Sequence, residues 1–427
     1  MYLLKTLSKA WKIEETRSKI IFTLLMLLVY RIGSNIPVPG IDRAYLANMF
    51  NGETGLFDLF DLFSGGAFSN FTIFALSITP YITASIIVQL LTVAFPYLER
   101  LAKEGTEGRK KMAQITRYMS VVLALIQAIG LTIGLFRKAI INPNAFTMIT
   151  IIVILTAGST FLMWLGEEIN DKGVGNGISL LIFGGIVARI PTMIRGLSVK
   201  IKGGELSIIA IIAIVIISIL IVMVVIEMQQ GVRKIPVQYA KRVVGRKMYG
   251  GQSTHIPMKV NQAGVIPIIF ALSLLQFPLT ITYFFPGTKF TDFVTKYLSP
   301  SGNPGVWVYA VLNVVLIMMF TYFYTVITFN PKEVADQMRA NGGFIPGIRP
   351  GIATIEYLSR IMSRLCLAGG IFLAAVATLP TIINQFTPLH NLAFGGTSLL
   401  IMVGVALDTV QQLENQMLMR NYQGFLK

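Results

Sequence analysis

Long runs of apolar residues with almost no charge constrain this chain most. About 20 apolar residues cross a bilayer as a helix, and in lipid only helices or closed barrels satisfy the backbone. The run at 206–226, rich in Ile and Val, is the clearest case. The whole chain is 54% hydrophobic and only 13% charged, whereas a water-soluble surface needs roughly 25–35% charged residues. We therefore predict an all-α polytopic membrane protein.

Ten such runs follow one another along the chain, with short connections. They predict spans at 19–38, 71–96, 118–136, 147–166, 177–194, 206–226, 262–285, 306–329, 364–384 and 395–413. Arg31 interrupts the first run and the fifth is short, so both can lie inside the bundle. Residues 1–18 place lysines among apolar residues, which predicts an amphipathic interfacial helix rather than a cleavable signal.

The distribution of Lys and Arg predicts the orientation, because acidic residues contribute little to the positive-inside bias. With the N-terminus inside, the inner segments hold 26 of the 36 Lys and Arg residues. Both termini are therefore predicted to be cytoplasmic. The outer segment at 189–205, with Arg189, Arg195, Lys200 and Lys202, runs against the rule.

Few residues could carry chemistry. The single cysteine, Cys366, excludes an intramolecular disulfide, and only two histidines, His255 and His390, lie far apart. No nucleotide-binding, hydrolase or paired-carboxylate motif stands in the loops. Ionisable residues are nearly absent from the predicted membrane midplane, which disfavours an ion-driven carrier. We predict a protein that is not an enzyme and needs no cofactor or metal, leaving a passive conduit, a receptor or a scaffold.

Residues 55–70, between the first two spans, are apolar and aromatic but too short to cross the membrane. Phe57, Phe60 and Phe63 can share one helical face, with Asp58 elsewhere. One interpretation is an interfacial helix on the outer leaflet. The other is a re-entrant helix inside the bundle, where irregular backbone is tolerated only in protein or a water-filled cavity. Gly65 and Gly66 would then form a hinge.

Two long inner loops, 227–261 and 330–364, carry much of the basic charge. The first holds Lys241, Arg242, Arg246 and Lys247. Topology and attraction to anionic lipid explain any such cluster. They do not explain why Arg349 stands in a run of Pro and Gly, which places one basic side chain on a shaped turn. We favour partner docking for these loops.

Several separated motifs identify a family. They are Ser64-Gly65-Gly66-Ala67, Ile78-Thr79-Pro80-Tyr81-Ile82, Gly173-Val174-Gly175-Asn176-Gly177-Ile178-Ser179, Gln252-Ser253-Thr254-His255-Ile256-Pro257, Ala263-Gly264-Val265-Ile266-Pro267, Asn330-Pro331, the stretch 344–351, and Gly395-Gly396-Thr397-Ser398-Leu399-Leu400. In this order and spacing they closely resemble the SecY and translocon alpha-subunit family over essentially the whole chain. Any one motif alone would be weak.

The resemblance implies ten spans in two inverted five-helix halves, 19–200 and 201–427, around an hourglass pore. By local motif matching, the aliphatic ring at the constriction would comprise Ile78, Ile82, Ile182, Ile269 and Ile401. The residues themselves show only that Ile78 and Ile82 are four apart around Pro80 and so share a helical face. Ordinary core packing is the alternative for all five.

The resemblance also implies that 55–70 is a plug, including Phe57, Asp58, Phe60, Phe63, Ser64, Gly65 and Gly66. The pore would open sideways between the second and seventh spans. Thr83, Gln127, Phe277 and Pro278 would lie along this lateral gate. The alternative for Gln127 is a hydrogen bond between helices of one half, worth only about 0.6 kcal/mol on average in membranes.

The family further implies SecE-like and SecG-like small membrane subunits, and docking of the SecA motor ATPase or a ribosome on the inner loops, chiefly at Arg349. Basic loops also suit ribosomal RNA. We thus expect a channel in the bacterial plasma membrane that binds signal sequences, passes unfolded secretory polypeptides and releases apolar segments into lipid. The rival hypotheses are a secondary transporter and a membrane scaffold for a cytosolic ATPase.

Overall fold

The structure is a computed structural model that describes most of the chain. The described residues are 11–46, 61, 64–203, 208–239, 242–244, 247–249, 253–282, 284–285, 287–298, 305–386 and 396–424. The long helices are α2 (Glu14–Gly33), α5 (Thr79–Ala94), α7 (Thr106–Gly130), α8 (Ala145–Lys172), α9 (Gly177–Lys202), α10 (Ile208–Gln230), α11 (Ile266–Thr282), α13 (Gly305–Thr328), α15 (Ile352–Phe386) and α16 (Gly396–Gly424). The predicted amphipathic helix at 1–18 falls largely outside these ranges.

Each predicted apolar run overlaps one of these helices, because a charge-poor run can satisfy its backbone in lipid only within itself. By length and hydropathy, four helices in the described ranges could each cross a membrane. They are α7 with its short continuation Leu131–Leu135, α8, α13 with the helix after it, and α15. A fifth candidate is α5 together with α6 (Pro96–Lys103), which is bent by 103°.

The predicted span 71–96 is helical only from Thr79 onward. Residues 65–78 instead form turns, with an isolated bridge between Thr72 and Pro37, and Ser77 has a φ of 53°. Pro80 stands at the start of α5, where its missing N–H costs nothing. A proline also disfavours helical backbone in the residue before it, so the helix cannot extend far in the N-terminal direction.

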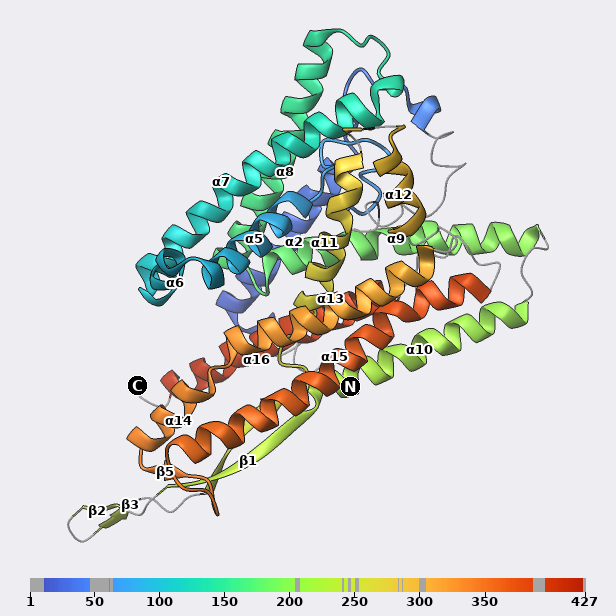
Figure 1. Cartoon of the computed structure of the whole chain (residues 1–427). Coiled ribbons are helices and arrows are strands. Elements are labelled where there is room, and N and C mark those ends of the chain that lie inside the picture. The colour runs from blue at the N-terminus through green and yellow to red at the C-terminus, as the bar shows by residue number, and fades with distance from the viewer. Residues whose placement is uncertain are drawn as a thin grey trace.

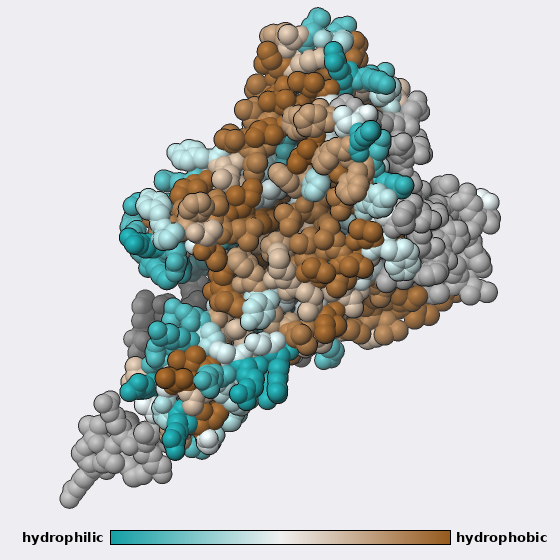
Figure 2. All heavy atoms as spheres, viewed as in Figure 1, coloured by the Kyte–Doolittle hydropathy of each residue, from teal (hydrophilic) through white to brown (hydrophobic). Residues whose placement is uncertain are grey.

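The helices form two groups joined by a few crossing elements (Figure 1). In the first group, α7 packs against α5 and α8, while α2 packs against α8 and α9. In the second, α13 packs against α15, and α16 against α10 and α15. Helix α9 also contacts α16, and α11 contacts α13, α5 and α7, so these two elements connect the groups. Figure 2 shows hydrophobic residues over much of the visible surface, with hydrophilic residues toward its ends.

The two long loops predicted to face the cytoplasm contain strands, which corrects a purely all-α fold to a mostly helical one. Strand β1 (Val232–Tyr239) pairs antiparallel with β4 (Ser253–Lys259) and with β5 (Gly343–Phe344), while β2 (Arg242–Val244) pairs with β3 (Lys247–Tyr249). The β4-β1-β5 sheet therefore unites both loops. Short helices also lie outside the predicted spans, among them α12 (Lys289–Tyr297) and α14 (Pro331–Ala340). Asn330 caps α14 by accepting from the Lys332 N–H.

Candidate functional site

The five isoleucines singled out in the sequence lie in one buried hydrophobic cluster. They come from the start of α5, from α9, α11 and α16, and none is more than 7% exposed. Ile78 and Ile82 are one turn apart, and the Ile82 N–H donates to the Ile78 carbonyl at 3.1 Å. The cluster therefore draws on elements from both groups of helices.

Ala67 belongs to the same cluster and is fully buried. It follows Ser64, Gly65 and Gly66 in the segment expected to act as a plug, so this part of the segment packs directly onto the hydrophobic centre. The other predicted plug residues, Phe57, Asp58, Phe60 and Phe63, lie outside the described part of the chain. Within residues 64–70, Ser64, Gly65, Ala67 and Phe68 are buried, whereas Asn70 is exposed.

Hydrogen bonds tie this segment to α2. The Tyr30 hydroxyl donates to the Ser64 carbonyl at 3.1 Å, and Arg31 Nη1 donates to the Gly65 carbonyl at 3.3 Å. Arg31, which interrupts the first apolar run, thus has a partner at an otherwise irregular stretch of backbone. These contacts satisfy carbonyl groups that no helix serves.

An ion pair ties the segment to α9. Arg189 Nη2 lies 3.2 Å from Asp61 Oδ2, and only 7% of the Asp61 side chain and 19% of the Arg189 side chain are exposed. Asp61 Oδ1 also accepts the Ser69 N–H at 2.9 Å, which folds the segment back on itself. Arg189 Nη1 is buried and finds no hydrogen-bond partner among the described residues. In the sequence, Arg189 stands out only as part of the basic segment that runs against the charge rule.

Gly65 allows the segment to approach α9 closely. A Cβ at this position would lie 2.8 Å from the Gly185 Cα, and Gly65 has a φ of +65°. Both the space and the backbone conformation therefore favour glycine. Gly66 has a φ of +91°, but a Cβ there would meet its nearest neighbour only at 3.9 Å.

The residues predicted to line the lateral gate fall on α5, α7 and α11, which contact one another. Thr83 on α5 and Gln127 on α7 are buried, while Phe277 on α11 is exposed and Pro278 is half-buried. Thr83 Oγ1 donates locally, to the Thr79 carbonyl at 3.0 Å.

Gln276, the residue before Phe277 on α11, was not predicted from the sequence. Its side chain is 3% exposed, and its Nε2 has no hydrogen-bond partner in the described ranges. The signal available was an amide within the apolar run 262–285.

The predicted docking residues divide between described and undescribed parts of the chain. Lys241 and Arg246 lie outside the described residues, whereas Arg242 and Lys247 belong to β2 and β3. Arg349 is exposed in the turn between β5 and α15, and its carbonyl accepts from Thr354 Oγ1 at 3.0 Å. Gly347 and Gly351 flank it with φ of 81° and 109°, so glycines shape this turn.

No group of three or more His, Cys, Asp or Glu side chains converges anywhere in the described ranges. His255 is exposed on β4 and Cys366 is buried in α15. His390 lies outside the described residues.

Comparison with known proteins decides the family. A sequence model of the SecY family matches residues 72–410. The protein translocase subunit SecY of Halalkalibacterium halodurans is 48% identical over 439 residues, covering 100% of both chains. The chain belongs to the SecY family.

Solved structures agree with the SecY family in fold. A structure described as that of a protein-conducting channel aligns with a TM-score of 0.69 at 22% identity, covering 93% of this chain and 92% of the other. Sec61 in the canine ribosome-channel complex from the endoplasmic reticulum aligns with a TM-score of 0.64 at 19% identity, with the same coverage. At these identities the likeness concerns the fold alone.

Proposed function

We propose that this SecY-family chain forms a protein-conducting channel that passes unfolded secretory polypeptides across the bacterial plasma membrane. The observation that carries this proposal is the single hydrophobic cluster that holds the five isoleucines together with Ala67. Helices from both groups meet there, and the segment after Gly66 packs onto it. This packing supports a closed channel in which a narrow apolar constriction would have a removable cover.

An aliphatic ring formed by Ile78, Ile82, Ile182, Ile269 and Ile401 would serve two purposes. Apolar side chains offer ions no replacement for their hydration, so a narrow constriction resists wetting. The same side chains make no fixed hydrogen bonds and can therefore fit varied polypeptide segments. Residues 55–70 would act as the plug, held in the resting state by its contacts with Tyr30, Arg31 and Arg189.

Lateral release of apolar segments would occur where α11 meets α5 and α7. This seam lies between the second and seventh of ten proposed spans, in two inverted halves. Buried polar side chains such as Thr83, Gln127 and Gln276 lower the cost of parting two otherwise apolar surfaces. A signal sequence that binds better to the open seam would shift the closed-to-open equilibrium.

Energy for transport must come from partners, because the channel itself would be non-enzymatic. Both termini and the β4-β1-β5 sheet would face the cytoplasm, where Arg349 and the basic residues Lys241, Arg242, Arg246 and Lys247 would receive a SecA motor ATPase or a ribosome with its RNA. The canine Sec61 neighbour was solved in a ribosome-channel complex. SecE-like and SecG-like subunits would complete the channel.

Ion conductance in planar bilayers tests this function. The intact protein, with its small membrane subunits, is compared with a variant lacking residues 57–67. We expect a quiet intact channel and a leaky deletion variant, since the deletion removes Asp61, Gly65 and Ala67. If neither protein conducts ions in the presence of a signal peptide, the result would instead favour a membrane scaffold. Saturable uptake of a small molecule would favour a carrier.

A further inference from the structure

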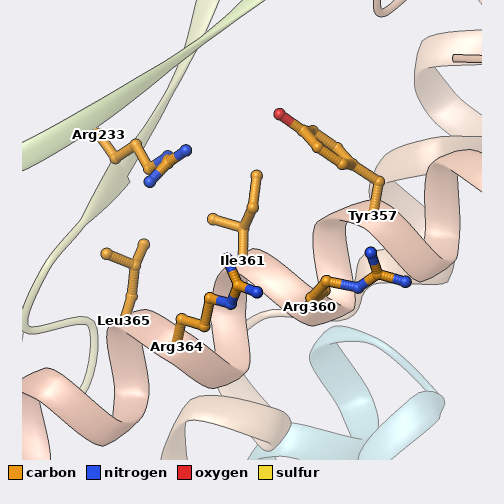
Figure 3. Close-up of a pocket in the computed structure, with 6 residues that line it drawn as sticks. All are labelled: Arg233, Tyr357, Arg360, Ile361, Arg364 and Leu365. Atoms are coloured by element: carbon orange, nitrogen blue, oxygen red, sulfur yellow. The ribbon is translucent and has the colours of Figure 1, made fainter.

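Three arginines line one pocket between β1 and the beginning of α15. None of the proposed ring residues, and none of the plug residues that the structure describes, lines this pocket. The cavity has a volume of about 230 Å³. It is lined by Arg233, Tyr357, Arg360, Ile361, Arg364 and Leu365. Figure 3 shows the Arg233 guanidinium and the Tyr357 hydroxyl pointing toward one another across the opening.

The positive charge of this pocket is not balanced within the described part of the chain. None of the three arginines takes part in an ion pair or a side-chain hydrogen bond there. Glu356, one turn before Arg360, is exposed and pairs with none of them. Guanidinium groups carry only donors, in a fork that matches phosphate oxygens, and the phenol adds a further donor. The chemistry favours a phosphate-bearing anion.

Buried contacts hold the two walls of the pocket in place. Ile235 of β1 and Leu358, Ile361 and Met362 of α15 belong to one hydrophobic cluster, and each is at most 6% exposed. Tyr357 and Leu365 pack against the same cluster. The strand that carries Arg233 is therefore fixed over the helix that carries Arg360 and Arg364, so the three arginines, all exposed, line the same pocket before any ligand arrives.

The pocket lies at a membrane boundary. The 22 residues from Leu365 to Phe386 are free of charge, and as helix they extend about 33 Å, close to the roughly 30 Å of a hydrocarbon core. Arg364 therefore stands where the core begins. Leu367 and Ile371, three and seven residues further on, share its helical face and are 58% and 55% exposed.

We propose that this pocket binds the phosphate of an anionic phospholipid, with an acyl chain lying along Leu367 and Ile371. Leu367 and Ile371 form an exposed apolar face next to Arg364, which an acyl chain can cover. RNA has no comparable apolar part, so a lipid is favoured over RNA. The site goes beyond channel activity and does not depend on it, because lipid binding is measured without translocation.

Native mass spectrometry of the purified complex tests the proposal. The protein is titrated with dioleoyl phosphatidylglycerol and, separately, with dioleoyl phosphatidylcholine. In the double variant R360Q/R364Q we expect the tightest phosphatidylglycerol binding to weaken about thirtyfold, from about 1 kcal/mol for each arginine near the surface. The matched control is K332Q/R339Q on α14, which removes two exposed cations from the same inner loop, 330–364, and should leave binding unchanged.

R233Q gives a second test on the other wall of the pocket, with an expected loss of about fivefold. Equal binding of both lipids, or unchanged phosphatidylglycerol binding in R360Q/R364Q and R233Q, would overturn the proposal. Full displacement of phosphatidylglycerol by millimolar inorganic phosphate would identify a site for soluble phosphate instead. Binding of a twelve-nucleotide RNA that is lost in R360Q/R364Q while lipid binding persists would identify an RNA site.

Discussion

Arg189 on α9 and Asp61, ahead of the Ser64-Gly65-Gly66 turn, form an ion pair at 3.2 Å with little solvent access. Arg189 is also one of the few basic residues predicted on the outer side of the membrane. The ion pair gives a physical reason for this one arginine: it neutralises a carboxylate that would otherwise be buried unpaired. The contact joins the proposed plug to the helix that carries Ile182.

Breaking this pair should open the resting channel to ions. D61N and R189Q each leave a largely buried group without its partner, a cost of about 3–5 kcal/mol that destabilises the docked plug. We expect higher basal conductance in planar bilayers for each single variant and partial recovery in the charge-swapped D61R/R189D protein. D42N, which removes an exposed carboxylate on the same predicted side, is the control. If both single variants have the same low basal conductance as the wild type, the ion pair contributes to folding alone.

The close approach of Gly65 to Gly185 gives a sharper test, because Gly66 provides a matched neighbour. Both glycines have positive φ, so alanine costs roughly 1–2 kcal/mol of backbone strain at either position. Only at Gly65 does the added Cβ also meet backbone, at 2.8 Å. We therefore expect G65A to raise basal conductance well above G66A. Equal conductance of the two variants would show that packing against α9 does not hold the segment.

The ten apolar helices could be predicted from sequence because lipid leaves a charge-poor run no other way to satisfy its backbone. The strands could not. Ile235, Val237 and Tyr239 alternate as a strand requires, but Pro236 among them argues against one. The structure resolves this conflict: β5 pairs only with Gln238 and Tyr239, so at Pro236 one side of β1 is an edge, where a missing N–H is tolerated.

The candidate site was less predictable for a different reason. Isoleucine is an ordinary core residue, so Ile182 and Ile401 could be singled out only through family resemblance. Asp61 and Arg189 are far apart in sequence, and nothing local indicates that they meet. The only signal in the sequence was the basic segment 189–205 on the predicted outer side. For Arg189, the ion pair with Asp61 is the structural explanation.

Polar substitution in the five-isoleucine cluster should raise ion leak specifically. I82N and I401N place an amide among hydrophobic side chains that we propose to seal the pore. The amide can hold water, so we expect higher basal conductance and acceptance of weaker signal sequences. The control is I151N on α8, an equally buried isoleucine in a separate cluster. Greater leak in I151N than in the cluster variants would show that general destabilisation, not loss of a seal, causes conductance.

Charge reversal at Arg349 should impair motor-driven export while leaving the protein in the membrane. Its side chain is exposed on a turn shaped by Gly347 and Gly351, and the loop makes its internal contact through the Arg349 carbonyl rather than its guanidinium. R349E should therefore fold normally, with a stability change within about 0.5 kcal/mol, as is usual for surface positions. Export is measured with vesicles, purified motor ATPase and a radiolabelled preprotein, alongside membrane levels by immunoblot. R339E reverses an exposed charge on α14 in the same loop and should export normally. If R349E and R339E export equally well, the basic turn contributes to the orientation of the protein in the membrane and not to docking of the motor ATPase.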